Sequence, residues 1–164
     1  VLGKLPLKFE RYNMITIEEF KNKITKKSRL IGLDLGTKRI GIAICDELQS
    51  IATPFKTVKK DNFVKFLDEL KLIIKENNIE GIIVGNPINM DGTLGSSAQS
   101  VNDVCFNISK YVDIPLCLWD ERLSTVGAFN LSSQLDINVS KKIKKIDQNA
   151  AAFILQGVLD YLKN

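Results

Sequence analysis

The segment "RLIGLDLGTKRIGIAICD", residues 29–46, decides the fold of this chain. Two apolar runs flank a short polar turn, which is the pattern of two buried β-strands joined as a hairpin. One carboxylate, Asp34, stands within the first run. Because an ionised carboxylate among apolar neighbours is costly unless something pairs with it, Asp34 requires an explanation. It could bind a metal, belong to a phosphate-binding turn, or cap the turn of the hairpin.

Strand and helix patterns alternate after the hairpin. Residues 51–59 predict a third strand, in which Pro54 indicates an edge position or a bulge. Residues 61–78 have the apolar spacing of an amphipathic helix, with Asp61 as its N-cap. The continuous apolar run of residues 79–87 is typical of a strand that is covered on both faces.

The second half of the chain continues this alternation. We expect a helix capped by Ser96 or Ser97, a buried strand over residues 114–122, a short helix over 124–135 and a last amphipathic helix over 146–163. A three-stranded meander followed by alternating helices and strands predicts an α/β fold, with a mixed five-stranded sheet flanked by helices. This layout fits the ribonuclease H-like (RNase H-like) fold, and the actin-like ATPase fold is built around the same kind of unit.

The length of 164 residues suits one domain. We expect residues 1–28 to form an N-terminal extension that is partly helical or disordered, and residues 29–164 to form the domain. Apolar residues of the extension recur at the spacing of a short amphipathic helix: Ile15, Ile17, Phe20 and Ile24. No run of about 18 apolar residues predicts a membrane span, and the N-terminus is too polar for a signal peptide, so we expect a cytoplasmic protein.

The residue types limit the chemistry. The absence of histidine excludes histidine triads, HExxH zinc sites and histidine acid–base catalysis. Cys45, Cys105 and Cys117 form no CxxC pair and lie in apolar segments, so we expect reduced core cysteines. The net charge of +4 is too small to indicate nucleic acid by itself. Hydrolysis would have to use carboxylates, lysine, hydroxyls or a metal held by oxygen.

Carboxylates occupy three places where the pattern favours apolar or neutral residues. Asp34 lies in the first strand, Asp120 and Glu121 directly follow a buried strand, and Asp147 shares a helix face with Ala151 and other apolar residues. Each has a structural explanation: a turn cap for Asp34, an ion pair with a neighbouring cation for Glu121, and the helix dipole for Asp147. Together they favour a shared site, because strand and helix ends can meet at one edge of an α/β sheet.

Carboxylates gathered at one point repel each other and need a cation. Oxygen ligands alone suit Mg²⁺ or Mn²⁺. One such ion, or two about 4 Å apart, can activate water and stabilise the leaving oxygen in phosphodiester cleavage. The pattern therefore predicts a metal-dependent nuclease, in which Asp34, Glu121 and Asp147 are the ligands; whether Asp120 takes part stays open.

Four motifs resemble, in order, those of the YqgF/RuvX family of bacterial pre-16S rRNA nuclease-like and Holliday-junction-resolvase-like proteins. They are "GLDLGTKRIGIAICD" (32–46), "IIVGNPINMDGTLGSSA" (82–98), "WDERLST" (119–125) and "KKIDQNAAAFILQGVLD" (144–160). The resemblance implies an RNase H-like hydrolase with Asp34, Glu121 and Asp147 as catalytic, metal-binding carboxylates. It further implies processing of the 5′ end of pre-16S rRNA in ribosome biogenesis, or resolution of branched DNA in recombination and repair. The sequence departs from the family at Asn86, where the family more often has leucine, which concerns local packing.

Basic residues flank each acidic element. Such clusters suit a polyanion drawn to the metal, with phosphates bound irrespective of sequence. The predicted nucleic-acid contacts are Lys38, Arg39, Arg122, Lys141, Lys142, Lys144 and Lys145. Expected partners are pre-rRNA or branched DNA, and ribosomal particles, but no membrane; monomer and homodimer both stay open.

Two other classes of function compete with the nuclease. "LDLGT" (33–37) also resembles the phosphate-binding hairpin of actin-like ATPases, although that class needs a second phosphate loop and usually twice this length. Alternatively, the chain is a non-catalytic module that binds RNA through its basic residues. The choice between RNA and DNA, and between one and two metal ions, also stays open.

Overall fold

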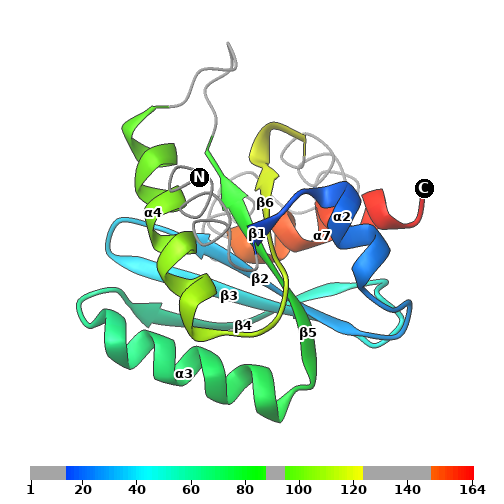
Figure 1. Cartoon of the computed structure of the whole chain (residues 1–164), viewed down its shortest axis with the longest axis horizontal. Coiled ribbons are helices and arrows are strands. Elements are labelled where there is room, and N and C mark those ends of the chain that lie inside the picture. The colour runs from blue at the N-terminus through cyan, green and yellow to red at the C-terminus, as the bar shows by residue number, and fades with distance from the viewer. Residues whose placement is uncertain (1–13, 88–94, 124–148) are drawn as a thin grey trace, which may run out of the picture.

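The computed structural model describes residues 14–87, 95–123 and 149–164, and it is built around one mixed β-sheet (Figure 1). The predicted hairpin is present as β2 (Arg29–Leu35) and antiparallel β3 (Arg39–Cys45). The meander continues into β4 (Ala52–Lys59), which pairs antiparallel with β3 and forms one edge of the sheet. The first three predicted strands are therefore confirmed.

Parallel strands form the other half of the sheet. β5 (Ile79–Asn86) lies beside β2, and β6 (Leu116–Asp120) lies beside β5. A two-residue strand, β1 (Met14–Ile15), pairs with β6 and gives six strands in the order β1-β6-β5-β2-β3-β4. The predicted mixed α/β class is confirmed, but the predicted number of five strands is wrong by this short strand, because two residues are too few for an alternating pattern.

Pro54 lies on edge strand β4, as predicted. Ile42 pairs with Lys56 whereas the next residue, Ala43, pairs with Pro54, so one residue of β4 is skipped at a bulge. An edge strand with a bulge accommodates proline, which has no N–H to donate to a neighbouring strand.

Helices cover both faces of the sheet (Figure 1). One hydrophobic cluster joins the sheet to α3 (Phe63–Glu76) and α4 (Ser96–Tyr111). A second cluster, on the other face, joins it to α2 (Ile17–Lys23) and α7 (Ala150–Leu162). Strand residues alternate between the two clusters: Leu30 and Ile83 belong to the second, and Ile31 and Ile82 to the first.

Two predicted helix caps are wrong by one residue. Asn62, not Asp61, caps α3: its side chain accepts a hydrogen bond from the N–H of Lys65, and asparagine caps helices as well as aspartate does. The N-cap of α4 is Gly95, which precedes the two predicted serines. The predicted helix over 124–135 and the start of the predicted helix at 146 lie outside the described residues.

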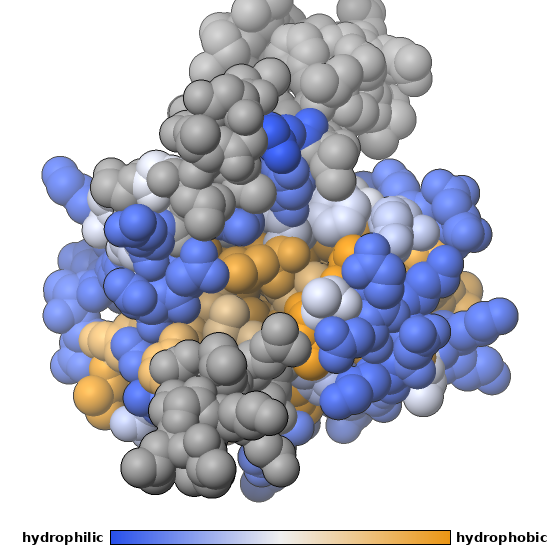
Figure 2. Space-filling view, turned by 45° about the horizontal axis from the view of Figure 1, so that its top comes forward, coloured by the Kyte–Doolittle hydropathy of each residue, from blue (hydrophilic) through white to orange (hydrophobic). Residues whose placement is uncertain are grey.

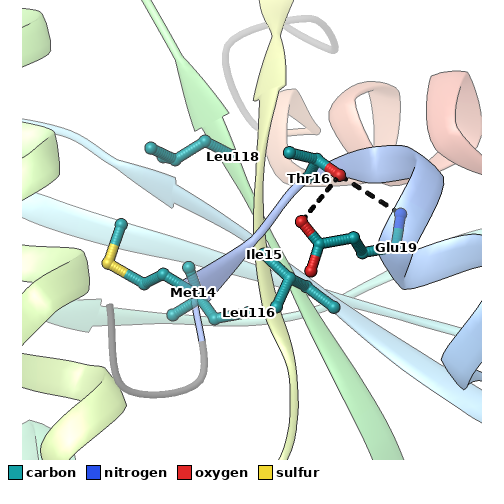
Figure 3. A pocket seen from close by; sticks show the side chains of 6 residues that line it. All are labelled: Met14, Ile15, Thr16, Glu19, Leu116 and Leu118. Atoms are coloured by element: carbon teal, nitrogen blue, oxygen red, sulfur yellow. Dashed lines mark hydrogen bonds between the residues drawn. The ribbon is translucent and has the colours of Figure 1, made fainter. Parts of the chain in front are cut away.

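The residues before β2 extend the sheet and cover it. Thr16 caps α2 by accepting a hydrogen bond from the N–H of Glu19, and its hydroxyl donates to the Glu19 carboxylate (Figure 3). Both residues line a hollow of about 310 Å³ whose other walls are Met14, Ile15, Leu116 and Leu118. On α2, Phe20 is fully buried, and a Cβ atom on Gly81 of β5 would overlap its ring. The division between extension and domain at residue 29 stays a prediction.

The surface and the thiols of the described ranges bear on the sequence-based expectations. In Figure 2, hydrophilic residues surround a smaller hydrophobic area. Cys45, Cys105 and Cys117 are buried free thiols, as predicted, and burial raises the pKa of Cys105 and of Cys117 to about 12. No described helix is both long enough and apolar enough to span a membrane.

The position of α7 depends on glycine in β2. A Cβ atom on Gly32 would lie 2.8 Å from the Leu155 Cβ and 2.9 Å from the Ala151 carbonyl oxygen, so α7 packs directly on the backbone of β2. A Cβ atom on Gly41 of β3 would instead lie 3.6 Å from the Ala151 Cβ and 3.7 Å from the Asp34 Cβ, which are ordinary contacts.

We therefore expect Gly32→Ala to lower the free energy of unfolding by about 2 kcal/mol, since the added methyl group forces α7 away from the sheet. Gly41→Ala is the matched control and should stay within about 1 kcal/mol of the parent. Urea unfolding followed by circular dichroism measures both. Equal stability of the two variants would contradict this account of how α7 is held.

Candidate active site

Asp34 lies near the carboxyl end of β2, on the face of the sheet that α7 covers. It pairs in register with Gly41 of β3, and neither Gly41 nor its strand neighbours place a bulky group over it. The carboxylate is half-buried, and the structure shows no hydrogen bond or ion pair for it among the described residues. Of the uses left open by the sequence, capping of the hairpin turn is thus not observed.

Glu121 reaches the same place from β6. It is the first residue of the 3₁₀-helix η1 (Glu121–Leu123), which directly follows that strand. In the sheet, β5 lies between β2 and β6, and Gly85 is next to Val84, the partner of Leu33. The Glu121 Oε1 atom lies 2.5 Å from the position that a Cβ atom on Gly85 would occupy. Because Gly85 has no side chain, Glu121 can lie over β5 toward Asp34.

The charges of the two carboxylates affect each other, which agrees with their being neighbours. Burial raises the pKa of Asp34 above its ordinary value of 3.8. Burial, then the negative charge of Asp34, then that of Asp120 raise the pKa of Glu121 above its ordinary value of 4.5. Two half-buried carboxylates that each disfavour ionisation form a site that gains from a bound cation.

Asp120 is engaged differently from Glu121. The Arg122 guanidinium donates hydrogen bonds to both Asp120 oxygens, at 2.6 Å from Nη2 to Oδ2 and 3.0 Å from Nε to Oδ1. The hydrogen bond from this side chain lowers the pKa of Asp120. Asp120 therefore forms an ion pair with Arg122. The predicted contact of Arg122 with nucleic acid stays a prediction.

The third predicted carboxylate, Asp147, lies outside the described residues, as do Lys141, Lys142, Lys144 and Lys145. The chain re-enters the described part at residue 149, and the first turn of α7 brings Ala151 to Gly41, beside Asp34. Within residues 14–87, 95–123 and 149–164, no group of three or more acidic, histidine or cysteine side chains could hold a metal. The described residues supply two carboxylates of the predicted three.

The tip of the hairpin carries more positive charge than the sequence analysis assigned to it. Lys38 and Arg39 are exposed there, and their predicted contact with nucleic acid stays a prediction. Arg39 pairs across the strands with Lys59, and the N–H of Lys60 donates to the carbonyl of Lys38. We call Lys38, Arg39, Lys59 and Lys60 the basic tip. Like charges opposite each other on neighbouring strands are destabilising, so this pairing suits an anionic partner.

Asn86, the departure from the family pattern, is on the other face of the sheet. Its neighbour Val84 two residues earlier belongs to the α3–α4 cluster, and strand alternation puts residue 86 on that face. Its Oδ1 atom is buried and has no hydrogen-bond partner in the described structure. The change thus affects packing under α4 and not the face that carries Asp34.

The donor set fits a hard divalent cation. The oxygen atoms of Asp34 and Glu121 are the ligands that Mg²⁺ and Mn²⁺ prefer, and a bound cation would favour the ionised forms that burial disfavours. The described site contains no thiol that would favour a softer metal, since all three cysteines lie in the core.

The comparisons with known proteins first define the class. The fold is similar to that of T. thermophilus RuvC in complex with a Holliday junction substrate, with a TM-score of 0.60 at 10% sequence identity, over 83% of this chain and 95% of that one. At this identity the likeness concerns the fold alone. It confirms the predicted RNase H-like fold.

The sequence then defines the family. The family model described as "RuvX: Holliday junction resolvase" matches residues 28–161, so the chain belongs to the RuvX family. A relative from Pelagibacter ubique (strain HTCC1062), named "Putative pre-16S rRNA nuclease", is 74% identical over 151 residues, which cover 92% of this chain and 100% of the relative. A relative of the same name from Cereibacter sphaeroides (strain ATCC 17025) is 44% identical and covers 90% of this chain and 92% of its own.

The raised pKa values predict how stability depends on pH. A carboxyl group whose pKa is higher in the folded than in the unfolded chain binds its proton more tightly when folded. Without divalent cations, the free energy of unfolding should therefore fall as the pH rises from the ordinary values of 3.8 and 4.5 through the raised values of Asp34 and Glu121. At about pH 7.5, Asp34→Asn should be more stable than the parent by about 1 kcal/mol.

Urea unfolding in EDTA between about pH 5 and about pH 7.5 measures this effect. Asp120 and Asp46 have lowered pKa values, so the stability that they contribute is lost only as the pH falls below 3.8, outside this range. Asp113→Asn, which removes an exposed carboxylate before β6, is the control and should follow the parent. An Asp34→Asn variant with the parent's pH dependence would contradict the assignment.

The space over Gly85 predicts a second effect. In Gly85→Ala the new Cβ atom would lie 2.5 Å from both the Glu121 Oε1 and the Ile154 Cδ1 atoms, the mobile ends of two side chains. We expect a loss of only about 1 kcal/mol in stability but a displaced Glu121 carboxylate, and Mn²⁺ affinity lower by about tenfold or more. Isothermal titration calorimetry measures the affinity, with Asp113→Asn, an exposed position before β6, as the control. Equal affinity for the parent and Gly85→Ala would show that Glu121 does not need this space.

Proposed function

We propose that this protein is a divalent-metal-dependent nuclease, a hydrolase of phosphodiester bonds in structured nucleic acid. The observation that carries the proposal is the meeting of Asp34 and Glu121 over Gly85, in a half-buried place where each pKa is raised. Neighbouring half-buried carboxylates with raised pKa values are typical of functional sites, and a bound divalent cation would favour their ionised forms. Membership of the RuvX family and the nuclease names of the relatives support the same conclusion.

In this proposal Asp34, Glu121 and Asp147 hold Mg²⁺ or Mn²⁺. The bound ion would supply a more acidic water and a Lewis acid for the scissile phosphate. Asp34 and Glu121 fix their oxygen atoms at the edge of the sheet before substrate arrives, because β2 and the end of β6 hold their backbones. Lys38 and Arg39 bind backbone phosphates beside them, and Arg122, Lys141, Lys142, Lys144 and Lys145 extend this contact.

The preferred substrate is pre-16S rRNA, cleaved during maturation of its 5′ end in ribosome biogenesis in the cytoplasm. The names of the two relatives support this substrate. Branched DNA is the second candidate, supported by the description of the family and by the fold of a protein solved with a Holliday junction. A non-catalytic RNA-binding module would leave the raised pKa values of Asp34 and Glu121 without a role, and an actin-like ATPase would need a second phosphate loop.

Cleavage assays with Mn²⁺ or Mg²⁺ test the proposal. The substrates are a pre-16S rRNA fragment with its 5′ extension and a four-way DNA junction. We expect Asp34→Asn and Glu121→Gln to reduce cleavage by about 100-fold or more and to weaken Mn²⁺ binding, while Asp113→Asn behaves as the parent.

The two substrates distinguish the two candidates. Cleavage of the RNA alone supports the rRNA nuclease, and cleavage of the junction alone supports the resolvase. Parental activity in Asp34→Asn would overturn the metal-nuclease proposal, and ATP hydrolysis that is lost in the same variant would favour the ATPase. Circular dichroism of each variant shows that a loss of activity is not a loss of fold.

A further inference from the structure

A small hollow lies at the same edge of the sheet as Asp34, but around the tip of the hairpin from it. Its volume is about 240 Å³, and its lining is formed by Leu35, Gly36, Thr37, Lys60, Pro87, Ser100 and Val101. Leu35 directly follows Asp34 in β2, and Pro87 follows the end of β5. The hollow thus lies between the hairpin turn, the carboxyl end of β5 and the second turn of α4.

We propose that this hollow binds a phosphate of the nucleic-acid backbone next to the one that is cleaved, with Lys60, Thr37 and Ser100 as its binding residues. The proposal rests on the proposed function and adds to it a second phosphate site outside the metal centre. None of these three residues was assigned a role by the sequence analysis.

Lys60 is held in place before any ligand arrives. Its backbone N–H donates to the Lys38 carbonyl at 3.0 Å, and its ammonium group donates to the Gly36 carbonyl at 3.2 Å. The side chain is half-buried, and no ion pair of Lys60 occurs in the described part of the chain. A lysine side chain that is already held in place loses less conformational entropy when it binds an anion than a freely rotating surface lysine does.

The other polar groups of the lining match an oxyanion. Thr37 and Ser100 each contribute a hydroxyl group, and none of the described residues that line the hollow is acidic. A tetrahedral phosphate accepts hydrogen bonds from an ammonium group and from hydroxyl groups, whereas the Lys60 ammonium group would repel a cation.

The position of the hollow favours a polymer over a free anion. Lys60 of the hollow donates its backbone N–H to the Lys38 carbonyl, and Arg39 pairs with Lys59, so the positive charge of the basic tip continues into the hollow. A phosphodiester backbone that reaches Asp34 from the hollow would contact this charge at successive phosphates. The contact carries no base information, so we expect binding that is independent of sequence.

Binding of fluorescent probes in EDTA tests the subsite apart from cleavage. The probes are a four-way DNA junction and an RNA hairpin with a single-stranded 5′ tail, measured by anisotropy over a series of salt concentrations. We expect Lys60→Gln to weaken binding of at least one probe by about threefold to tenfold and to reduce the salt slope by about one. Lys75→Gln, at the far end of α3, is the control for net charge and should bind as the parent.

Ser100→Ala distinguishes a specific phosphate site from non-specific electrostatic attraction. It changes no charge, so it should weaken binding by about twofold to fivefold with the salt slope unchanged. Equal binding by Lys60→Gln and Lys75→Gln, or no effect of Ser100→Ala, would overturn the proposal, as would a parent that binds neither probe. The thermal stability of the parent is also measured in inorganic phosphate and in chloride of equal ionic strength. If Lys60→Gln abolishes stabilisation of the fold by phosphate but leaves probe binding unchanged, the proposal is also overturned, because the hollow would then bind a free anion.

The failure of this proposal can be told from the failure of the proposed function. Probe binding that depends on Lys60 and Ser100, without cleavage in Mn²⁺, would keep the subsite and remove the nuclease. Cleavage that depends on Asp34, with no effect of Lys60→Gln on binding, would do the reverse. Thermal unfolding of each variant shows that the turn held by Lys60 remains folded.

Discussion

The repulsion between two half-buried carboxylates is the constraint on which the rest of this structure depends. Asp34 and Glu121 come from strands that are not adjacent, and they meet because the strand between them has glycine at the crossing point. In water the pair would separate at little cost. Here β2 and the end of β6 fix both backbones, and α7 and the sheet limit access of solvent, so the charge stays concentrated.

Two glycines on the sheet face that α7 covers, Gly32 and Gly85, make this arrangement possible. Gly32 lets α7 rest on β2, which places the first turn of that helix beside Asp34, and Gly85 leaves room for Glu121. The opposite face has a different task. Large apolar side chains fill it under α3 and α4 and hold the sheet rigid. Asp34 and Glu121 thus lie on the face that α7 covers, and buried side chains on both faces contribute to stability.

Much of the fold was predictable because its patterns are local. The hairpin, the continuous apolar strand β5 and the amphipathic helix α3 each follow from residues close together in the chain. The two-residue strand β1 was missed because its pairing with β6 is decided by tertiary contacts alone. The helix caps were displaced by one residue where two neighbouring residues cap equally well, as Asp61 and Asn62 do.

The residue types of the site could be predicted from the sequence, but the contacts that these residues make with each other could not. Carboxylates in apolar segments pointed to Asp34 and Glu121, because burial of charge leaves a signal in one sequence. The roles of Asp120 and Glu121 could not be separated, since they depend on which residue Arg122 reaches. Lys59 and Lys60 join Arg39 and Lys38 only through the register of β3 and β4, and a register between strands is not contained in local composition.

The position of the acidic pair also bears on how the chain folds. Asp34 and Glu121 are far apart in the sequence, and β5 must lie between their strands before they approach each other. Such long-range parallel pairing has a large entropic cost and forms late, so the hairpin and α3 can form without any repulsion from the pair. The repulsion between Asp34 and Glu121 should therefore mainly accelerate unfolding of the metal-free protein. The folding rate should depend little on whether a cation is present.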